Sequence, residues 1–127
     1  MEEENCALLF LLAGQSNMAG RGRRKAERAP RPPPDLNVRA FHNSSHEWSL
    51  ANHPLHDDKP DKAAIGPGLD FALELRRRFK LAGRPQQQVL LVPCAVGGSP
   101  IRRWSPGADL YERALDSTRR ALDSHAA

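Results

Sequence analysis

The chain has 127 residues, of which 39% are hydrophobic and 27% charged, with a formal net charge of +4. This length and composition favour one small globular domain that buries its own core. No apolar run approaches the roughly 20 residues that span a bilayer. The acidic start Met1–Glu4 has the wrong charge for a secretory signal, so we expect a cytoplasmic rather than a secreted protein. Two cysteines form no disulfide framework, and no Cys/His spacing predicts a metal site.

The first expected element is an apolar strand over residues 7–13, which ends abruptly at Gly14-Gln15-Ser16. A short, fully apolar run that stops at glycine is typical of a buried parallel strand entering a tight turn. Ser16 then lies at the carboxyl end of a strand, where open α/β sheets place their ligand crevices. Two interpretations stay open from spacing alone: a catalytic nucleophile or the N-cap of a helix.

The next segment, residues 21–34, combines six Lys or Arg residues with three successive prolines. Proline removes backbone donors, so we expect a solvated loop on the active-site side of the sheet. Residues 35–41 predict a short strand around Val38 and Ala40, and residues 43–61 predict a long polar loop.

The second half of the chain predicts a helix, a strand and a final helix. The first helix follows Gly66, with charged residues 76–80 at its C-terminal end and a stop at Gly83; its apolar stripe is Leu69, Ala72, Leu73 and Phe79. Residues 89–92 form a second apolar run. Asp109 is expected to cap the last helix, whose packing face is Tyr111, Ala114, Leu115, Thr118 and Leu122. A strand, a connection containing a helix and a second strand predict an α/β fold with parallel strands.

Four ordered segments resemble one known family. They are Leu12-Ala-Gly-Gln-Ser-Asn-Met-Ala-Gly20, His53-Pro-Leu-His56 after Trp48, the glycine turn 65–72, and Val92-Pro-Cys-Ala-Val-Gly-Gly-Ser99 followed by Ile101-Arg-Arg-Trp104. Together they resemble the SGNH-type carbohydrate esterases, in the branch of sialate O-acetylesterases and plant acetylesterases (carbohydrate esterase family six). The resemblance implies a flavodoxin-like SGNH hydrolase fold, a three-layer sandwich around a parallel sheet.

The resemblance also implies a chemistry. Ser16 would be the nucleophile that removes O-acetyl groups from sugars or polysaccharides, with water as acyl acceptor and no cofactor. The N–H groups of Ser16 and Gly98 would form the oxyanion hole, since both strands end on one rim of the sheet. We expect substrate contacts from Gln15, Asn17, Gly97, His56 and Trp104. Trp48 and Trp104 serve equally well as packing residues, and both interpretations stay open.

Part of the family pattern is absent from these 127 residues. The family has a third block and a C-terminal Asp-x-x-His, whereas Asp123-Ser-His125 has one intervening residue instead of two. Residues 1–127 therefore resemble one incomplete domain, truncated at its C-terminal side. Without the catalytic base we expect this chain alone to be nearly inactive. The alternative that stays open is a substitute base from one of the loop histidines His42, His46, His53 and His56. We also expect the strand at 89–92 to lie at an exposed sheet edge and to promote self-association.

Two rival functions come from other classes. One is a non-catalytic carbohydrate-binding relic of the fold, which a longer product carrying the Asp-x-x-His would exclude. The other is a nucleic-acid binder, based on the basic clusters at residues 21–31 and 76–84. Neither cluster has interleaved aromatic residues for base stacking. We therefore favour an acetylated carbohydrate as the partner, with no nucleic acid and no membrane.

Overall fold

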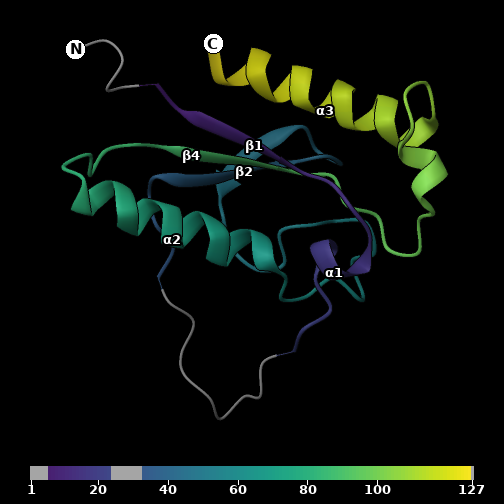
Figure 1. Cartoon of the computed structure of the whole chain (residues 1–127), viewed down its shortest axis with the longest axis horizontal. Helices are drawn as coiled ribbons and strands as arrows, with labels where there is room; N and C mark the ends of the chain where they lie inside the picture. Colours follow the sequence, from purple (N-terminus) through teal and green to yellow (C-terminus); the bar gives the residue numbers. More distant parts are fainter. Residues whose placement is uncertain (1–5, 24–32, 127) are drawn as a thin grey trace.

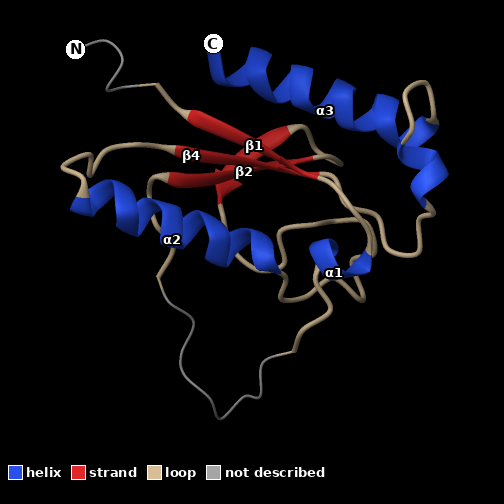
Figure 2. Cartoon of the chain, in the orientation of Figure 1, coloured by secondary structure: helices blue, strands red, loops and turns tan. Residues whose placement is uncertain are grey.

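The computed structural model describes residues 6–23 and 33–126. They form three layers, with one sheet between helix α2 (Pro67–Leu81) on one face and helix α3 (Asp109–Ala126) on the other (Figures 1 and 2). The one-turn helix α1 (Ser16–Ala19) and the 3₁₀ helix η2 (Ile101–Trp104) lie in the connections. This confirms the α/β fold expected from the alternation of strands and helices, and the three-layer sandwich that the family resemblance implied.

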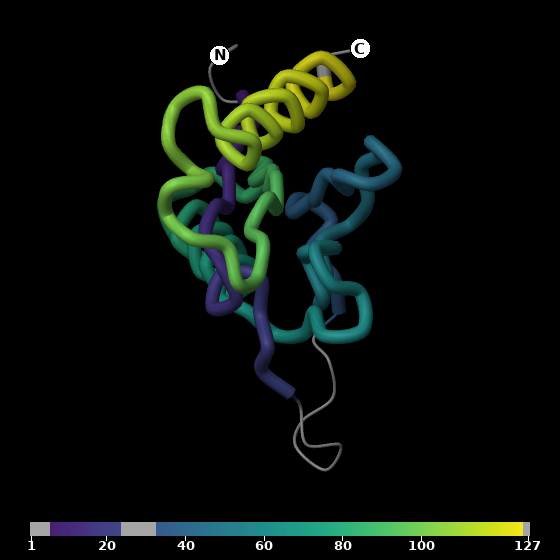
Figure 3. Tube along the Cα trace, turned by 90° about the vertical axis from the view of Figure 1, so that its right-hand side faces the viewer, coloured from purple at the N-terminus to yellow at the C-terminus, as the bar shows by residue number. Residues whose placement is uncertain are grey.

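The sheet has four strands in the order β1 (Leu8–Leu12), β4 (Val89–Pro93), β2 (Val38–His42) and β3 (Glu47–Leu50). Strand β4 pairs in parallel with β1 on one side and with β2 on the other. Strand β3 pairs antiparallel with β2. Figure 3 shows β1 (purple) and the β2–β3 hairpin (blue) on opposite sides of β4 (green).

Strand β4 supplies the centre of both hydrophobic cores. Val89 and Leu91 pack in the cluster that includes Ala72 of α2, whereas Val92 packs in the cluster that includes Ala114 of α3. Successive residues of a strand point to opposite faces, so a strand covered on both faces needs an unbroken apolar run. Each fully buried aliphatic side chain contributes about 1.5–3 kcal/mol relative to an exposed one. The run at 89–92 was therefore a reliable sequence signal.

The expected sheet edge was assigned to the wrong strand. Strand β4 is central, with a neighbour on each side, so its residues are not an exposed edge. The outer strands are β1 and β3, and in β1 the side chains of Leu8 and Leu11 are 39% and 40% exposed. The expectation of a buried first strand was also wrong for this reason: β1 has one neighbouring strand among the described residues and keeps one side open.

The stretch 43–61 is not entirely loop, because it contains strand β3. Residues 42–46 form the turn of a β2–β3 hairpin, in which His46 has a φ of 57° and its N–H donates to the carbonyl of His42 at 2.8 Å. The indole of Trp48 then packs edge-on against Phe41, with ring centroids 5.3 Å apart. This cross-strand aromatic pair stabilises β3, which is short and has polar residues on both sides.

The two long helices lie where the sequence placed them, with two corrections. Arg76 is not part of the exposed charged end of α2: it is 2% exposed, pairs with Asp35 at 3.2 Å and donates to the carbonyl of Gln87 at 2.9 Å. Leu122 does not belong to the packing face of α3, because it is 52% exposed. Ala114 of the expected face is buried, and the other buried residues of α3 are Leu110, Ser117 and Ala121.

The expected basic loop at 21–34 falls mostly outside the described residues, which include only its two ends. Of the helices in the described ranges, none combines the length and the apolar character needed to cross a membrane.

Candidate active site

The candidate nucleophile begins helix α1, directly after strand β1. Gln15 occupies the N-cap position of this helix, and no side chain caps it. The alternative interpretation of Ser16 as a capping residue is therefore wrong. Ser16 is half-buried, and its hydroxyl has no hydrogen-bond partner among residues 6–23 and 33–126. A serine hydroxyl that no structural contact occupies remains available for chemistry.

The ends of β1 and β4 run side by side toward one rim of the sheet. Beyond the strands, the N–H of Cys94 donates to the carbonyl of Leu12 at 2.8 Å, and the N–H of Val96 donates to the carbonyl of Gly14 at 3.0 Å. Ser16 follows Gly14 by two residues, and the 97–98 turn follows Val96 at once. The parallel pairing thus brings the two sequence-predicted segments to the same rim, at the carboxyl ends of the strands.

The two glycines of this turn play different parts. The N–H of Gly97 donates to Asp58 Oδ2 at 2.8 Å, so it is already used within the protein. Gly98 is exposed, has a φ of +73°, and its N–H has no acceptor among the described residues. The N–H of Ser16, at the start of a helix, also lacks a described acceptor. Two unpaired backbone donors at one rim are what an oxyanion hole requires.

Asp58 and Arg21 were missed by the sequence analysis. The Asp58 side chain is 1% exposed and binds Arg21 Nη2 at 2.9 Å as well as the Gly97 N–H. Burial alone would raise the pKa of Asp58, but the hydrogen bonds from Gly97 and Arg21 outweigh it and lower the pKa below its usual value. Arg21 lies 37 residues before Asp58 in the sequence and Gly97 lies 39 residues after it, so no local motif could reveal these contacts.

The expected substrate contacts differ in exposure. Gln15 and Asn17 flank Ser16 and are exposed. His56 is 3% exposed, and its Nδ1 accepts the N–H of Ala95 at 3.2 Å; burial lowers the pKa of His56 to about 4, so the ring is neutral. Because Ala95 follows β4, this hydrogen bond places His56 beside the carboxyl end of that strand. A substrate contact from His56 stays a prediction.

Trp104 is half-buried in η2, and its Nε1 donates to Ser99 Oγ at 3.0 Å. Ser99 Oγ in turn donates to the carbonyl of Val96 at 2.7 Å, which ties the indole to the 97–98 turn. The same indole lines an apolar groove of about 400 Å³ whose other walls are Leu11, Ala13, Gly14, Ile101, Tyr111, Ala114 and Leu115. The groove lies beside the end of β1, and Gly14 on its wall is two residues before Ser16.

None of the described histidines hydrogen bonds to Ser16. The imidazole of His42 pairs with Ser49 at 2.6 Å, and His125 packs edge-on against Trp48 with centroids 5.8 Å apart. The C-terminal Asp123-Ser-His125 belongs to helix α3, so the structure gives it no role as a catalytic pair.

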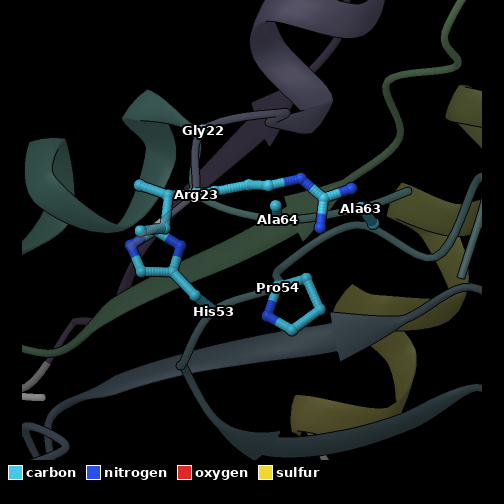
Figure 4. A pocket seen from close by; sticks show the side chains of 7 residues that line it. Gly22, Arg23, His53, Pro54, Ala63 and Ala64 are labelled. Atoms are coloured by element: carbon cyan, nitrogen blue, oxygen red, sulfur yellow. The ribbon is translucent and has the colours of Figure 1, made fainter. Parts of the chain in front are cut away.

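A separate pocket of about 300 Å³ lies beside the bridge that joins Gly22 to Ile65. Figure 4 shows the side chains of Arg23 and His53 on its walls, with Pro54 next to them. No group of three or more His, Cys, Asp or Glu side chains within the described ranges has the arrangement of a metal site.

Comparison with known proteins connects this geometry to one family. A family model described as "Carbohydrate esterase, sialic acid-specific acetylesterase" matches residues 7–127. A probable carbohydrate esterase of Arabidopsis thaliana is 32% identical over 123 residues, covering 87% of this chain and 46% of the relative. An X-ray structure of a protein from Arabidopsis thaliana superposes with a TM-score of 0.74 at 31% identity, covering 93% of this chain and 52% of that chain.

The crystal structure of NanS superposes with a TM-score of 0.61 at 20% identity, covering 93% of this chain and 49% of that chain, and supports the fold alone. This chain therefore spans about half the length of the relatives it matches.

Proposed function

Because this chain belongs to the carbohydrate esterases described as sialic acid-specific acetylesterases, we propose that it carries the nucleophile half of a serine acetylesterase site. One observation carries the proposal: the Ser16 hydroxyl and the Gly98 N–H lie on the same rim of the sheet, and neither bonds to another described residue. The substrate class is an acetylated carbohydrate, and no cofactor takes part in the reaction as proposed.

The reaction proceeds through an acetyl-enzyme. Ser16 Oγ attacks the carbonyl carbon of the acetyl ester while a general base takes the hydroxyl proton. The oxygen of the tetrahedral intermediate accepts hydrogen bonds from the N–H groups of Ser16 and Gly98. Each such donor is worth about 3 kcal/mol of transition-state stabilisation. The intermediate collapses with loss of the sugar oxygen, which takes the proton from the base and leaves as a hydroxyl. Water then releases acetate from Ser16 in a second addition and collapse.

We assign no general base among the described residues. No Asp-x-x-His occurs in the sequence, and no described histidine bonds to Ser16. We therefore expect the purified chain to hydrolyse an activated acetyl ester hardly faster than its Ser16→Ala variant. Binding and oxyanion stabilisation without the base leave only a small residual rate.

An external base distinguishes an incomplete esterase from a non-catalytic carbohydrate-binding relic. Imidazole added to the chain can take the Ser16 proton, so ester hydrolysis should rise with imidazole concentration beyond the rate for imidazole alone. Ser16→Ala should abolish this protein-dependent increase. Ser105→Ala, which removes an exposed hydroxyl after η2, serves as the matched control and should retain it. Equal rates for the chain and Ser16→Ala at every imidazole concentration would refute the proposal and favour the relic.

The described part of the basic clusters gives little support to the nucleic-acid alternative. Arg76 is buried, and Arg77 and Arg78 both pair with Glu74 at 2.7 and 3.2 Å. Pairing with Glu74 reduces the charge that these side chains offer to phosphates. The proposal therefore keeps a carbohydrate ester as the partner.

A further inference from the structure

Three segments that are distant in the sequence meet at the side chain of Asp58. Its Oδ2 accepts the N–H of Gly97 at 2.8 Å and Arg21 Nη2 at 2.9 Å. Arg21 also donates from Nη1 to the carbonyl of Gly20 at 2.9 Å, just after α1. The ion pair thus joins the loop that follows Ser16 to the turn that follows β4.

Arg21 packs directly against the glycine turn. A Cβ added to Gly97 would lie 2.4 Å from Arg21 Nη2 and 3.3 Å from Asp58 Oδ2. The guanidinium therefore occupies the space that any larger residue at position 97 would need. Gly97 is buried and held on two sides, which leaves Gly98 as the exposed residue of the turn.

The charges around this contact are balanced. The ionised carboxylate of Asp58 accepts the N–H of Gly97. The next residue, Gly98, carries the N–H that the proposed function assigns to the oxyanion. An unpaired negative charge there would oppose the negative charge that develops in the transition state. Arg21 neutralises it, while His56 is neutral. The nearby charged side chains are Asp57, which precedes Asp58, and Lys59, whose Nζ lies 3.8 Å from the position of a Cβ on Gly98.

We propose that Arg21 and Asp58 are positioning residues for the oxyanion donor. Asp58 engages the Gly97 N–H and so directs the Gly98 N–H to the rim, and Arg21 holds Asp58 and cancels its charge. This inference rests on the proposed function of Ser16 and Gly98. It assigns a role in acyl transfer to two residues that do not touch the substrate.

The first test measures imidazole-dependent acetyl transfer to Ser16 from an activated acetyl ester. Displacement of a catalytic group by about 1 Å costs about 100-fold in rate, so Arg21→Gln should lower the transfer rate by about 10- to 100-fold. Arg119→Gln removes the same charge from an exposed position on α3 and should leave the rate unchanged. Arg21→Lys keeps the charge without the planar fork and should show an intermediate rate.

A charge-balance signature separates positioning from general loss of structure. Asp58→Asn keeps an acceptor for Gly97 but removes the negative charge. Adding it to Arg21→Gln should therefore restore part of the lost rate, because no unbalanced carboxylate remains. A simple structural defect would instead be deepened by the second substitution. Wild-type rates in Arg21→Gln, with transfer still abolished in Ser16→Ala, would overturn the inference and leave the proposed function standing.

A second readout does not depend on activity. In the nuclear magnetic resonance spectrum of the chain, the Gly97 amide proton should exchange slowly and shift when Asp58 is replaced by Asn. The Gly98 amide should exchange fast and respond little. If no acetyl transfer to Ser16 occurs even with imidazole, the proposed function fails, and these amides still decide the contact. A Gly97 amide that ignores Asp58→Asn would overturn the positioning role.

Discussion

Substitution of Gly97 by alanine tests the contact between Arg21 and the turn most sharply. The new methyl group would lie 2.4 Å from Arg21 Nη2, which is too close for any real contact. Arg21 can move, because its side chain is flexible and 28% exposed. The expected response is therefore displacement of the guanidinium from Asp58 rather than movement of the backbone.

Two opposing terms set the magnitude. A hydrogen bond to a charged group contributes about 1.5–3 kcal/mol when buried, and partial exposure of Arg21 reduces this to about 1–2 kcal/mol. Replacing glycine by alanine where φ is not positive stabilises a protein by about 0.4–1 kcal/mol through the unfolded chain. Gly97 is not among the residues with a positive φ. We therefore expect Gly97→Ala to lower the free energy of unfolding by about 0.5–1 kcal/mol.

Urea denaturation of a double-mutant cycle measures both terms. In an Arg21→Ala background the contact with Arg21 is gone, and the new Cβ keeps only Asp58 Oδ2 close to it, at 3.3 Å. The same Gly97→Ala substitution should then be neutral or stabilise the chain by up to about 1 kcal/mol, so the loss of stability disappears in this background. An equal loss of stability in both backgrounds would refute the conclusion that Arg21 fills the space beside Gly97.

Three further predictions concern the core, the pH dependence and the sheet edge. Leu91→Ala, at a fully buried position of β4, should lower the free energy of unfolding by about 3–4 kcal/mol in urea titrations, and a loss below 1 kcal/mol would contradict its central place. Burial lowers the pKa of His56 from 6.5 to about 4, so the unfolded chain takes up this proton first as pH falls. The free energy of unfolding should therefore be fully retained above pH 6.5 and fall by about 2–3 kcal/mol toward pH 4. His56→Gln should reduce this fall. The same fall in wild type and variant would show that His56 is not buried and neutral. We also expect copies of the chain to associate through the open side of β1. Leu11→Lys should shift sedimentation velocity profiles toward the monomer, whereas Leu36→Lys, at a loop position 72% exposed, should not; equal profiles for both variants would argue against association through β1.

Sequence patterns predicted the elements whose burial is continuous. The unbroken apolar run at 89–92 correctly predicted β4, because both faces of that strand are covered. The glycine turn before Pro67 and the stop near Gly83 gave the bounds of α2 to within a residue or two, since these residues govern helix ends locally. Ser16 was placed at a strand end for the same local reason.

Features that depend on distant partners were not predictable. Arg76 belongs to a charged run, and its burial depends on its contacts with Asp35, 41 residues earlier, and with the carbonyl of Gln87. The contact of Asp58 with Gly97 likewise spans 39 residues and leaves no periodic signal. Strand β3 was missed because four residues between polar flanks are too few to show a period. The edge was misplaced because a strand's neighbours follow from topology, which one apolar run does not encode.

Mapping of acetyl groups on the chain tests the central claim most directly. The chain is incubated with an activated acetyl ester and imidazole, digested, and analysed by peptide mass spectrometry. The account predicts one acetyl group on the peptide that contains Ser16, dependent on imidazole and absent from the Ser16→Ala variant. Acetylation confined to lysines, and equal in the two proteins, would contradict the assignment of Ser16 as the nucleophile.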